Sequence, residues 1–231
     1  MRLLCAAITT LPALVAQGAS LDSKQIAQAI ERAQRNQQEA LCSYAVHRTY
    51  RLHNKHLHPD AQMDVDVTYT RGQPKQFHIT SLKAKGIAGR SLKDLLKNEA
   101  EADGIDNAKS ATAPQNYHLT LFGAESCGDL NCYKLGLRPR KKSKYLVAGT
   151  AWVSQKAFMF VRIEGTMSKS PSFWLSRPQI DQQFSNIHGF WLPTFNRSIT
   201  KVLFVGKAEL TIEYSSYSIT ACELRPHTQQ K

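Results

Sequence analysis

The fold is decided by residues 144–217, which read KYLVAGTAWVSQKAFMFVRIEGTMSKSPSFWLSRPQIDQQFSNIHGFWLPTFNRSITKVLFVGKAELTIEYSSY. Apolar and polar residues alternate along most of this stretch, and short polar breaks interrupt the alternation. A period of two is typical of antiparallel strands that have one wet face and one apolar face. The stretch therefore predicts successive strands over roughly 145–154, 157–165, 180–187, 190–204 and 208–220.

The chain before this stretch mixes the two kinds of element. Asp22 or Ser23 is a suitable N-cap, and apolar residues at helical spacing predict an amphipathic helix from there to about Leu41 and a second helix over roughly 91–103. Alternation predicts further strands over about 42–52, 63–69, 77–79, 117–121 and 133–137.

The first twenty residues have the pattern of an export signal. Arg2 gives a short positive region, an apolar region follows over 3–16, and small residues end at Ser20. The apolar region is too short to span a bilayer without its flanks. We therefore expect residues 1–20 to be a cleaved signal peptide and residues 21–231 to form a single periplasmic domain.

The chain is basic, with a formal net charge of +12. In an exported protein this charge favours anionic lipid or an acidic partner over nucleic acid. A basic run in a loop between strands is a candidate anionic-surface patch, although a solvated loop explains it equally well. The run consists of Arg138, Arg140, Lys141, Lys142 and Lys144.

Four cysteines remain after the predicted signal, and an even number in an oxidising compartment indicates disulfides. Cys127 and Cys132 frame a turn-rich loop, so we predict that they pair. A Cys42–Cys222 disulfide is the weaker expectation, because it needs the first and last strands to be neighbours. The spacing is poor for a zinc site.

The sequence has no recognisable catalytic constellation. His53, His56 and His58 share a predicted loop, where side chains diverge, and Asp64 and Asp66 lie on the solvent face of a strand. Motifs for nucleophilic hydrolysis, metalloprotease chemistry and phosphate binding are missing from the sequence. We predict a protein that is not an enzyme and has no metal or cofactor.

Several strands have apolar residues on both faces. Phe158 and Phe160, for example, alternate with Met159, Val161 and Ile163. Large aromatic residues usually fill a core. A sheet that is apolar on both faces must nevertheless be covered on both, and part of the cover can be a ligand cavity.

Short motifs between about residues 130 and 220 are shared with one family. They are GTAWV at 149–153 followed by AFMFVRIEG at 157–165, GFWLP at 189–193, and a final strand with Gly206, Leu210, Ile212 and Tyr214. These segments resemble the LolA/LolB-like superfamily of outer-membrane lipoprotein-sorting proteins, the lipoprotein carriers. The resemblance implies an open, incomplete antiparallel β-barrel of the α+β class, with an N-terminal helix and a second helix on its concave side.

In that family the hydrophobic cavity receives acyl chains, and an arginine holds the lid closed. The resemblance therefore implies a monomeric periplasmic carrier of a lipid or an acylated protein. No residue of this chain is matched to the lid arginine. The alternative is a non-enzymatic envelope sensor or assembly module that binds a protein partner.

Strand alternation predicts which side chains line the cavity. The wall is expected to consist of Val46, Tyr50, Val65, Val67, Phe158, Phe160, Trp191 and Leu210, with Leu92, Leu95 and Leu96 of the second helix as part of a lid.

Overall fold

The structure is a computed structural model that describes residues 21–56, 60–103, 112–172, 175–204 and 206–222. The signal peptide predicted over residues 1–20 and His58 of the histidine loop lie outside the described residues. None of the described helices is long and apolar enough to cross a membrane.

Helices and strands follow the order predicted from the sequence. Their bounds are α1 Ser23–Ala40, β1 Leu41–Asn54, β2 Ala61–Thr70, β3 Gln76–Lys83, α2 Gly86–Asp103, the 3-10 helix η2 Pro114–Asn116, β4 Tyr117–Cys127, β5 Leu130–Pro139, β6 Val147–Ser154, β7 Phe160–Met167, β8 Gln179–Ile187, β9 Phe190–Val202 and β10 Gly206–Ala221. The helix α2 begins at Gly86, earlier than predicted, because Ala88 is buried and continues the apolar stripe of the helix.

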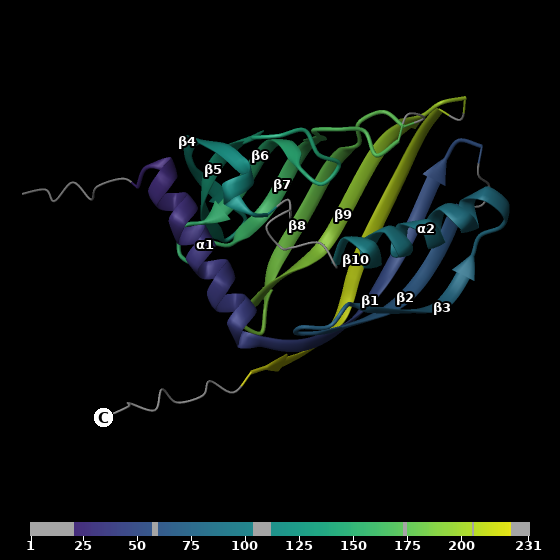
Figure 1. Cartoon of the computed structure of the whole chain (residues 1–231), viewed down its shortest axis with the longest axis horizontal. Coiled ribbons are helices and arrows are strands. Elements are labelled where there is room, and N and C mark those ends of the chain that lie inside the picture. Colours follow the sequence, from purple (N-terminus) through teal and green to yellow (C-terminus); the bar gives the residue numbers. More distant parts are fainter. Residues whose placement is uncertain (1–20, 57–59, 104–111, 173–174, 205, 223–231) are drawn as a thin grey trace, which may run out of the picture.

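The ten strands form one antiparallel sheet in the order β3-β2-β1-β10-β9-β8-β7-β6-β5-β4. The first and last strands of the chain, β1 and β10, are neighbours near the middle, and β3 and β4 are the two edges. The sheet is curved but unclosed (Figure 1). The predicted fold class, an α+β open barrel made mainly of antiparallel strands, is confirmed.

Each helix covers a different half of the sheet (Figure 1). On one half, Ile26 and Ile30 of α1 pack against strands β4 to β8. On the other half, Leu92 and Leu96 of α2 pack against β1, β2 and neighbouring strands. The hydrophobic core is therefore divided into two clusters, each closed by its own helix.

The start of α1 agrees with its predicted cap. The Asp22 carboxylate accepts a hydrogen bond from the backbone N–H of Gln25 at 2.8 Å, and the Gln25 side chain accepts one from the Asp22 N–H at 2.9 Å. This reciprocal capping box satisfies two amides that the helix itself leaves unpaired. It fixes the point at which the chain turns into α1.

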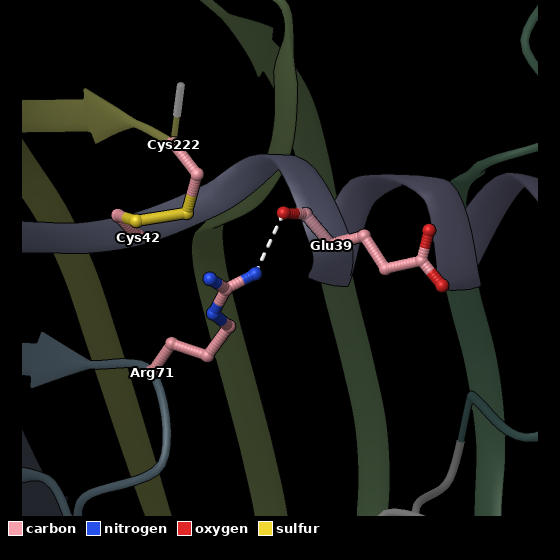
Figure 2. The surroundings of a disulfide bond; sticks show 4 residues. All are labelled: Glu39, Cys42, Arg71 and Cys222. Atoms are coloured by element: carbon pink, nitrogen blue, oxygen red, sulfur yellow. Dashed lines mark hydrogen bonds between the residues drawn. A yellow bond between two sulfur atoms is a disulfide. The ribbon is translucent and has the colours of Figure 1, made fainter. Parts of the chain in front are cut away.

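The disulfide pairing differs from the main prediction. Cys42 is bonded to Cys222, with their Cα atoms 4.9 Å apart (Figure 2). The register of β1 and β10 explains this bond, because Leu41 lies opposite Ala221. Arg71 closes the same corner by donating a 2.8 Å hydrogen bond to the carbonyl of Glu39 (Figure 2). The weaker of the two expected pairings is thus the one that forms.

The predicted Cys127–Cys132 disulfide is wrong in this structure, where both residues are free thiols. The prediction assumed a loop between them. Instead, β4 extends to Cys127, which lies opposite Leu130, and Cys132 lies opposite Glu125. The two cysteines are therefore diagonal neighbours across a tight hairpin, a wider separation than that of a directly opposed pair.

The two thiols are expected to differ in reactivity. Cys132 has no exposed surface, and its burial together with the neighbouring Cys127 raises the pKa of its thiol to about 12. Iodoacetamide should therefore label half-buried Cys127 in the native protein and leave Cys132 unlabelled, because the thiolate is the nucleophile. Peptide mass spectrometry measures both sites, and labelling in urea is the control. Protection of both cysteines in urea without a reductant would show that they are bonded after all.

Candidate functional site

One charged residue interrupts the apolar face of β1. Alternation along this strand places Tyr44, Val46, Arg48, Tyr50 and Leu52 on one face. The side chain of Arg48 is only 3% exposed, beneath α2. Charged residues are rarely buried to this degree without a partner.

The partner of Arg48 comes from α2. The Nη1 atom of Arg48 donates to both carboxylate oxygens of Glu99, at 3.0 and 2.9 Å. The Nζ atom of Lys75 lies 3.3 Å from the same carboxylate. Glu99 therefore joins the helix to one buried cation beneath it and to a second cation at its border.

Two tyrosines complete the surroundings of the guanidinium. Arg48 donates a 3.3 Å hydrogen bond to the hydroxyl of Tyr50, and its Cζ atom lies 4.9 Å from the ring centre of Tyr214. The Nε atom of Arg48 is buried and has no hydrogen-bond partner. One nitrogen of the guanidinium thus has no hydrogen-bond partner, and Glu99 is the carboxylate that neutralises its charge.

In this cluster, attraction between opposite charges outweighs the effect of burial on the pKa values. Burial alone would raise the pKa of the Glu99 carboxyl, but the cations Arg48 and Lys75 outweigh burial and lower it. Burial would also lower the pKa of Arg48, whereas Tyr214 and Glu99 raise it. Both groups therefore remain charged near neutral pH.

Most of the predicted cavity wall lies under α2, but as packed core. Val46, Tyr50, Val65 and Val67 are each at most 2% exposed. Leu92 and Leu96 of α2 pack on them, and Leu210 of β10 borders the same cluster. The structure brings these predicted residues together, and in this conformation their side chains fill the space between sheet and helix.

Leu95 does not belong to this group. It is 36% exposed, whereas Leu92 and Leu96, which pack in the cluster beneath α2, are at most 7% exposed. Leu92 and Leu96 are four apart and share a helix face, whereas Leu95 is rotated by about 100° from Leu96 and lies at the edge of that face. The prediction that Leu95 contributes to the inner face of the lid is therefore corrected.

The remaining predicted wall residues lie in the other half of the sheet. Phe160 is 5% exposed in the α1 cluster, and Phe158 packs against that cluster. Trp191 exchanges two backbone hydrogen bonds with the Gln37 side chain of α1, at 2.7 and 3.1 Å. The predicted continuous wall is thus divided, because alternation identifies a face of a strand but not the helix that covers it.

A polar strip separates the two clusters on the concave face. Leu210, Ser198 and Ile180 form one row across β10, β9 and β8, and directly opposed residues share a face. The next row contains Asn196 and Gln182. The middle of the concave face therefore presents hydroxyl and amide groups between two apolar regions.

The opposite face of these strands is rich in ion pairs. Arg162 binds Asp181 through two hydrogen bonds of 2.8 and 2.9 Å, and Arg197 binds Glu209 in the same bidentate way. Charged groups on a sheet surface of this kind are stable in contact with water. The two apolar clusters consequently mark the inner side of the sheet.

The predicted basic patch is placed on the surface. Arg138, Arg140, Lys141, Lys142 and Lys144 are all exposed, at the end of β5 and in the loop to β6. His53, which was predicted to lie in a loop, is part of β1 and pairs with Asp60 at 2.8 Å. Within the part of the chain that the structure describes, no group of three or more His, Cys, Asp or Glu residues is arranged to hold a metal ion.

Sequence reasoning missed Arg48 and Glu99 as site residues. The detectable feature was the charge of Arg48 at a position where alternation requires an apolar side chain. Its partner could not be found in the same way, because Glu99 lies 51 residues away on a helix, where a glutamate is an ordinary residue.

Several solved structures have a backbone fold similar to that of this chain. A LolA superfamily protein from Nitrosomonas europaea has 15% identity and a TM-score of 0.44, over 88% of this chain and 96% of that one. A DUF1329 family protein from Desulfovibrio piger has 12% identity and a TM-score of 0.46, over 87% and 94% of the two chains. An outer membrane lipoprotein-sorting protein domain from Vibrio parahaemolyticus has 11% identity and a TM-score of 0.46, over 87% and 92%. No protein-family model matches the sequence, and no curated protein matches it either.

Proposed function

We propose that this protein is an exported, periplasmic carrier that binds a lipid or the acyl chains of a lipoprotein between α2 and the sheet, without enzymatic activity. In this proposal α2 is a lid, and the conformation described above is the closed form, in which α2 packs on the sheet. The observation that carries the proposal is the ion pair between buried Arg48 and half-buried Glu99, which links the helix to the strand at the edge of an otherwise apolar contact.

A buried ion pair is a weak way of stabilising a helix that never moves. Well-packed apolar residues of similar volume often stabilise a protein equally well or better. A pair of charges differs from an apolar contact in one useful respect, because each charge can be hydrated when the two separate. Arg48 and Glu99 therefore suit an interface that opens to water and closes again.

The two helices differ in how firmly they are held. The helix α1 buries Ile26 and Ile30 completely, and its Gln34 and Gln37 side chains bond to the backbone of distant segments. The helix α2 buries few large side chains, and its Ile87 is 74% exposed. We therefore assign the movement to α2 and treat α1 as a fixed part of the wall.

Opening of α2 would expose an apolar surface of the size that an acyl chain needs. The surface contains Met63, Val65 and Val67 of β2 and Val46 and Tyr50 of β1. Each methylene group that such a surface removes from water contributes about 0.8 kcal/mol. At about 1.5–3 kcal/mol for each buried leucine, roughly four to eight methylene groups would offset the contacts that Leu92 and Leu96 lose.

Loosening the lid should strengthen acyl binding. In Leu96→Ala we expect a lower melting temperature without ligand and a roughly tenfold tighter apparent affinity for cis-parinaric acid, because the open form becomes more populated. Leu95→Ala is the matched control, since this adjacent leucine is exposed and should change neither value. Fluorescence titration of the probe and thermal unfolding measure the two effects.

The opposite result would be equally informative. If neither the wild type nor Leu96→Ala binds parinaric acid, the apolar face is permanent core and the carrier proposal is wrong. A non-enzymatic envelope sensor or assembly module with a protein partner would then be the better description.

A further inference from the structure

The hairpin between β9 and β10 ends in two exposed apolar residues. Phe204 is 97% exposed and Leu203 is 51% exposed. Phe204 also has a positive φ of 65°, a backbone conformation that bulky residues rarely adopt and that glycine or asparagine would adopt more easily. The turn itself thus gives no reason for a phenylalanine, and an outlier of this kind points to a role in binding.

Lysine residues flank this tip, and residues 201–207 of the sequence include no Asp or Glu. Lys201 of β9 lies directly opposite Lys207 of β10, and both are exposed. Like charges that face each other across two strands are destabilising. Lys55 reaches the same place. A methyl group in place of the Gly206 α-hydrogen would lie 3.7 Å from the Cε atom of Lys55. An anionic surface would convert this repulsion into attraction.

The tip is held in place by a neighbouring segment. Leu175 forms an isolated bridge with Val202, and the N–H of Ser176 donates a 2.9 Å hydrogen bond to the carbonyl of Lys201. The Ser176 hydroxyl accepts a 2.8 Å hydrogen bond from the N–H of Lys201. Leu175, Phe204 and their neighbours line an open pocket of about 570 Å³ at this position. The apolar tip is therefore preorganised.

The antiparallel register places three loops on one rim of the sheet. Val147 lies opposite Met167, Thr166 opposite Gln179, and Gly206 opposite Val202, so the loops that join these strands lie at the same end. We call the described segments 138–146, 168–172, 175–178, 201–204 and 206–207 the basic rim. Together they contain nine Lys or Arg residues and no Asp or Glu.

Hydrogen bonds connect the loops of the basic rim. The backbone N–H of Ser143 donates to the hydroxyl of Ser168 at 2.9 Å, and that hydroxyl donates to the Ser143 carbonyl at 2.9 Å. Ser176 makes the corresponding link to the hairpin. The β9–β10 hairpin extends to an outer corner of the molecule (Figure 1). These bonds tie residues 168 and 176 to the loops on either side, and all nine basic residues of the rim are exposed.

We propose that the basic rim docks on an anionic phospholipid bilayer, with Phe204 and Leu203 inserted among the headgroups and the lysines in contact with lipid phosphates. Aromatic residues are favoured at this depth of a membrane, and basic residues near it are attracted to anionic lipid. This docking goes beyond the proposed acyl binding and does not depend on it. It would place the protein at a membrane surface whether or not α2 is a lid.

Vesicle flotation tests the proposal. The purified protein should bind vesicles of phosphatidylcholine and phosphatidylglycerol at a ratio of 7:3 in low salt, and should not bind vesicles of phosphatidylcholine alone. Phe204→Ser should weaken binding about tenfold, given the free energy of removing one aromatic side chain from water. Lys201→Gln/Lys207→Gln should weaken it about 30-fold, since each lysine contributes about fivefold near an anionic surface.

Matched controls separate docking from general charge and exposure. Phe122→Ser removes another exposed phenylalanine from the middle of β4, and Arg35→Gln/Lys156→Gln removes two exposed charges away from the rim. Neither control should change vesicle binding. If the wild type fails to bind anionic vesicles in low salt, or if the controls lose as much binding as the rim variants, the proposal is overturned. The parinaric acid titration of the same variants should be unchanged, so failure of docking is distinguishable from failure of the carrier function.

Discussion

Glu99→Ala is expected to have the largest effect on α2. The substitution leaves the guanidinium of Arg48, only 3% exposed, without its carboxylate. Removing one partner of a buried pair typically costs about 3–5 kcal/mol, because a buried charge is left uncompensated. The chain can avoid this cost by letting α2 leave the sheet, so we expect the open form to become the major one.

Arg48→Met is the informative counterpart. It removes the buried charge and puts an apolar side chain in its place, while Glu99 keeps Lys75 as a partner at 3.3 Å. A change of this kind is often neutral or stabilising. We therefore expect α2 to stay closed and acyl binding to weaken, although the same ion pair has been broken.

Hydrogen exchange measured by mass spectrometry distinguishes the two variants. In Glu99→Ala, exchange should increase in residues 86–100 and in β2, and it should stay unchanged in β5 and β6 beneath α1. Arg48→Met should exchange like the wild type or more slowly. Equal effects of the two substitutions would mean that the pair acts by attraction alone, and the lid would then need another cause.

The pH dependence of α2 exchange gives an independent readout of the same pair. The cations lower the pKa of Glu99, so its contribution to closure is complete above the ordinary glutamate pKa of about 4.3 and is lost as the pH falls through the lower, folded-state value. Acidification below about pH 4 should therefore open α2. The double variant Arg48→Met/Glu99→Gln should lack this transition.

Local patterns were sufficient to predict most of the fold. The strand β2 alternates Met63, Val65 and Val67 with polar residues, and each of the three is fully buried. The first helix was predictable for the same reason, since its cap and its apolar stripe lie within one short segment. Period and capping depend on neighbours in the sequence, and these are the features that a sequence displays directly.

The candidate site depended on contacts that no local pattern contains. Val67 and Phe160 were both predicted to lie on the apolar faces of strands, yet they belong to different clusters under different helices. The pairing of Arg48 with Glu99 is set by the position of α2 across the strands. The alternation could therefore predict which residues are buried, but could not predict that the concave face is divided or where its charge lies.

The cysteines show the same limit, because closeness in sequence favoured Cys127–Cys132 while strand register brings Cys42 to Cys222.

Loss of the Cys42–Cys222 bond is expected to be the second large effect. The bond closes a loop with a sequence separation of 180, which includes nearly the whole sheet. Restricting an unfolded chain over a loop of this length stabilises the folded state by up to about 5 kcal/mol. Cys42→Ser/Cys222→Ser should lower the free energy of unfolding by an amount close to this value, measured by urea denaturation without a reductant.

The β1–β10 register should persist, because the backbone N–H of Cys222 donates a 2.7 Å hydrogen bond to the carbonyl of Ala40 independently of the sulfur atoms. Cys127→Ser is the matched control, since its thiol is free and its removal should leave stability within about 1 kcal/mol. A loss under 1 kcal/mol in the double variant would mean that the unfolded chain is already restricted by residual structure, and that the corner formed by Arg71 and Glu39 holds the two strands together without the bond.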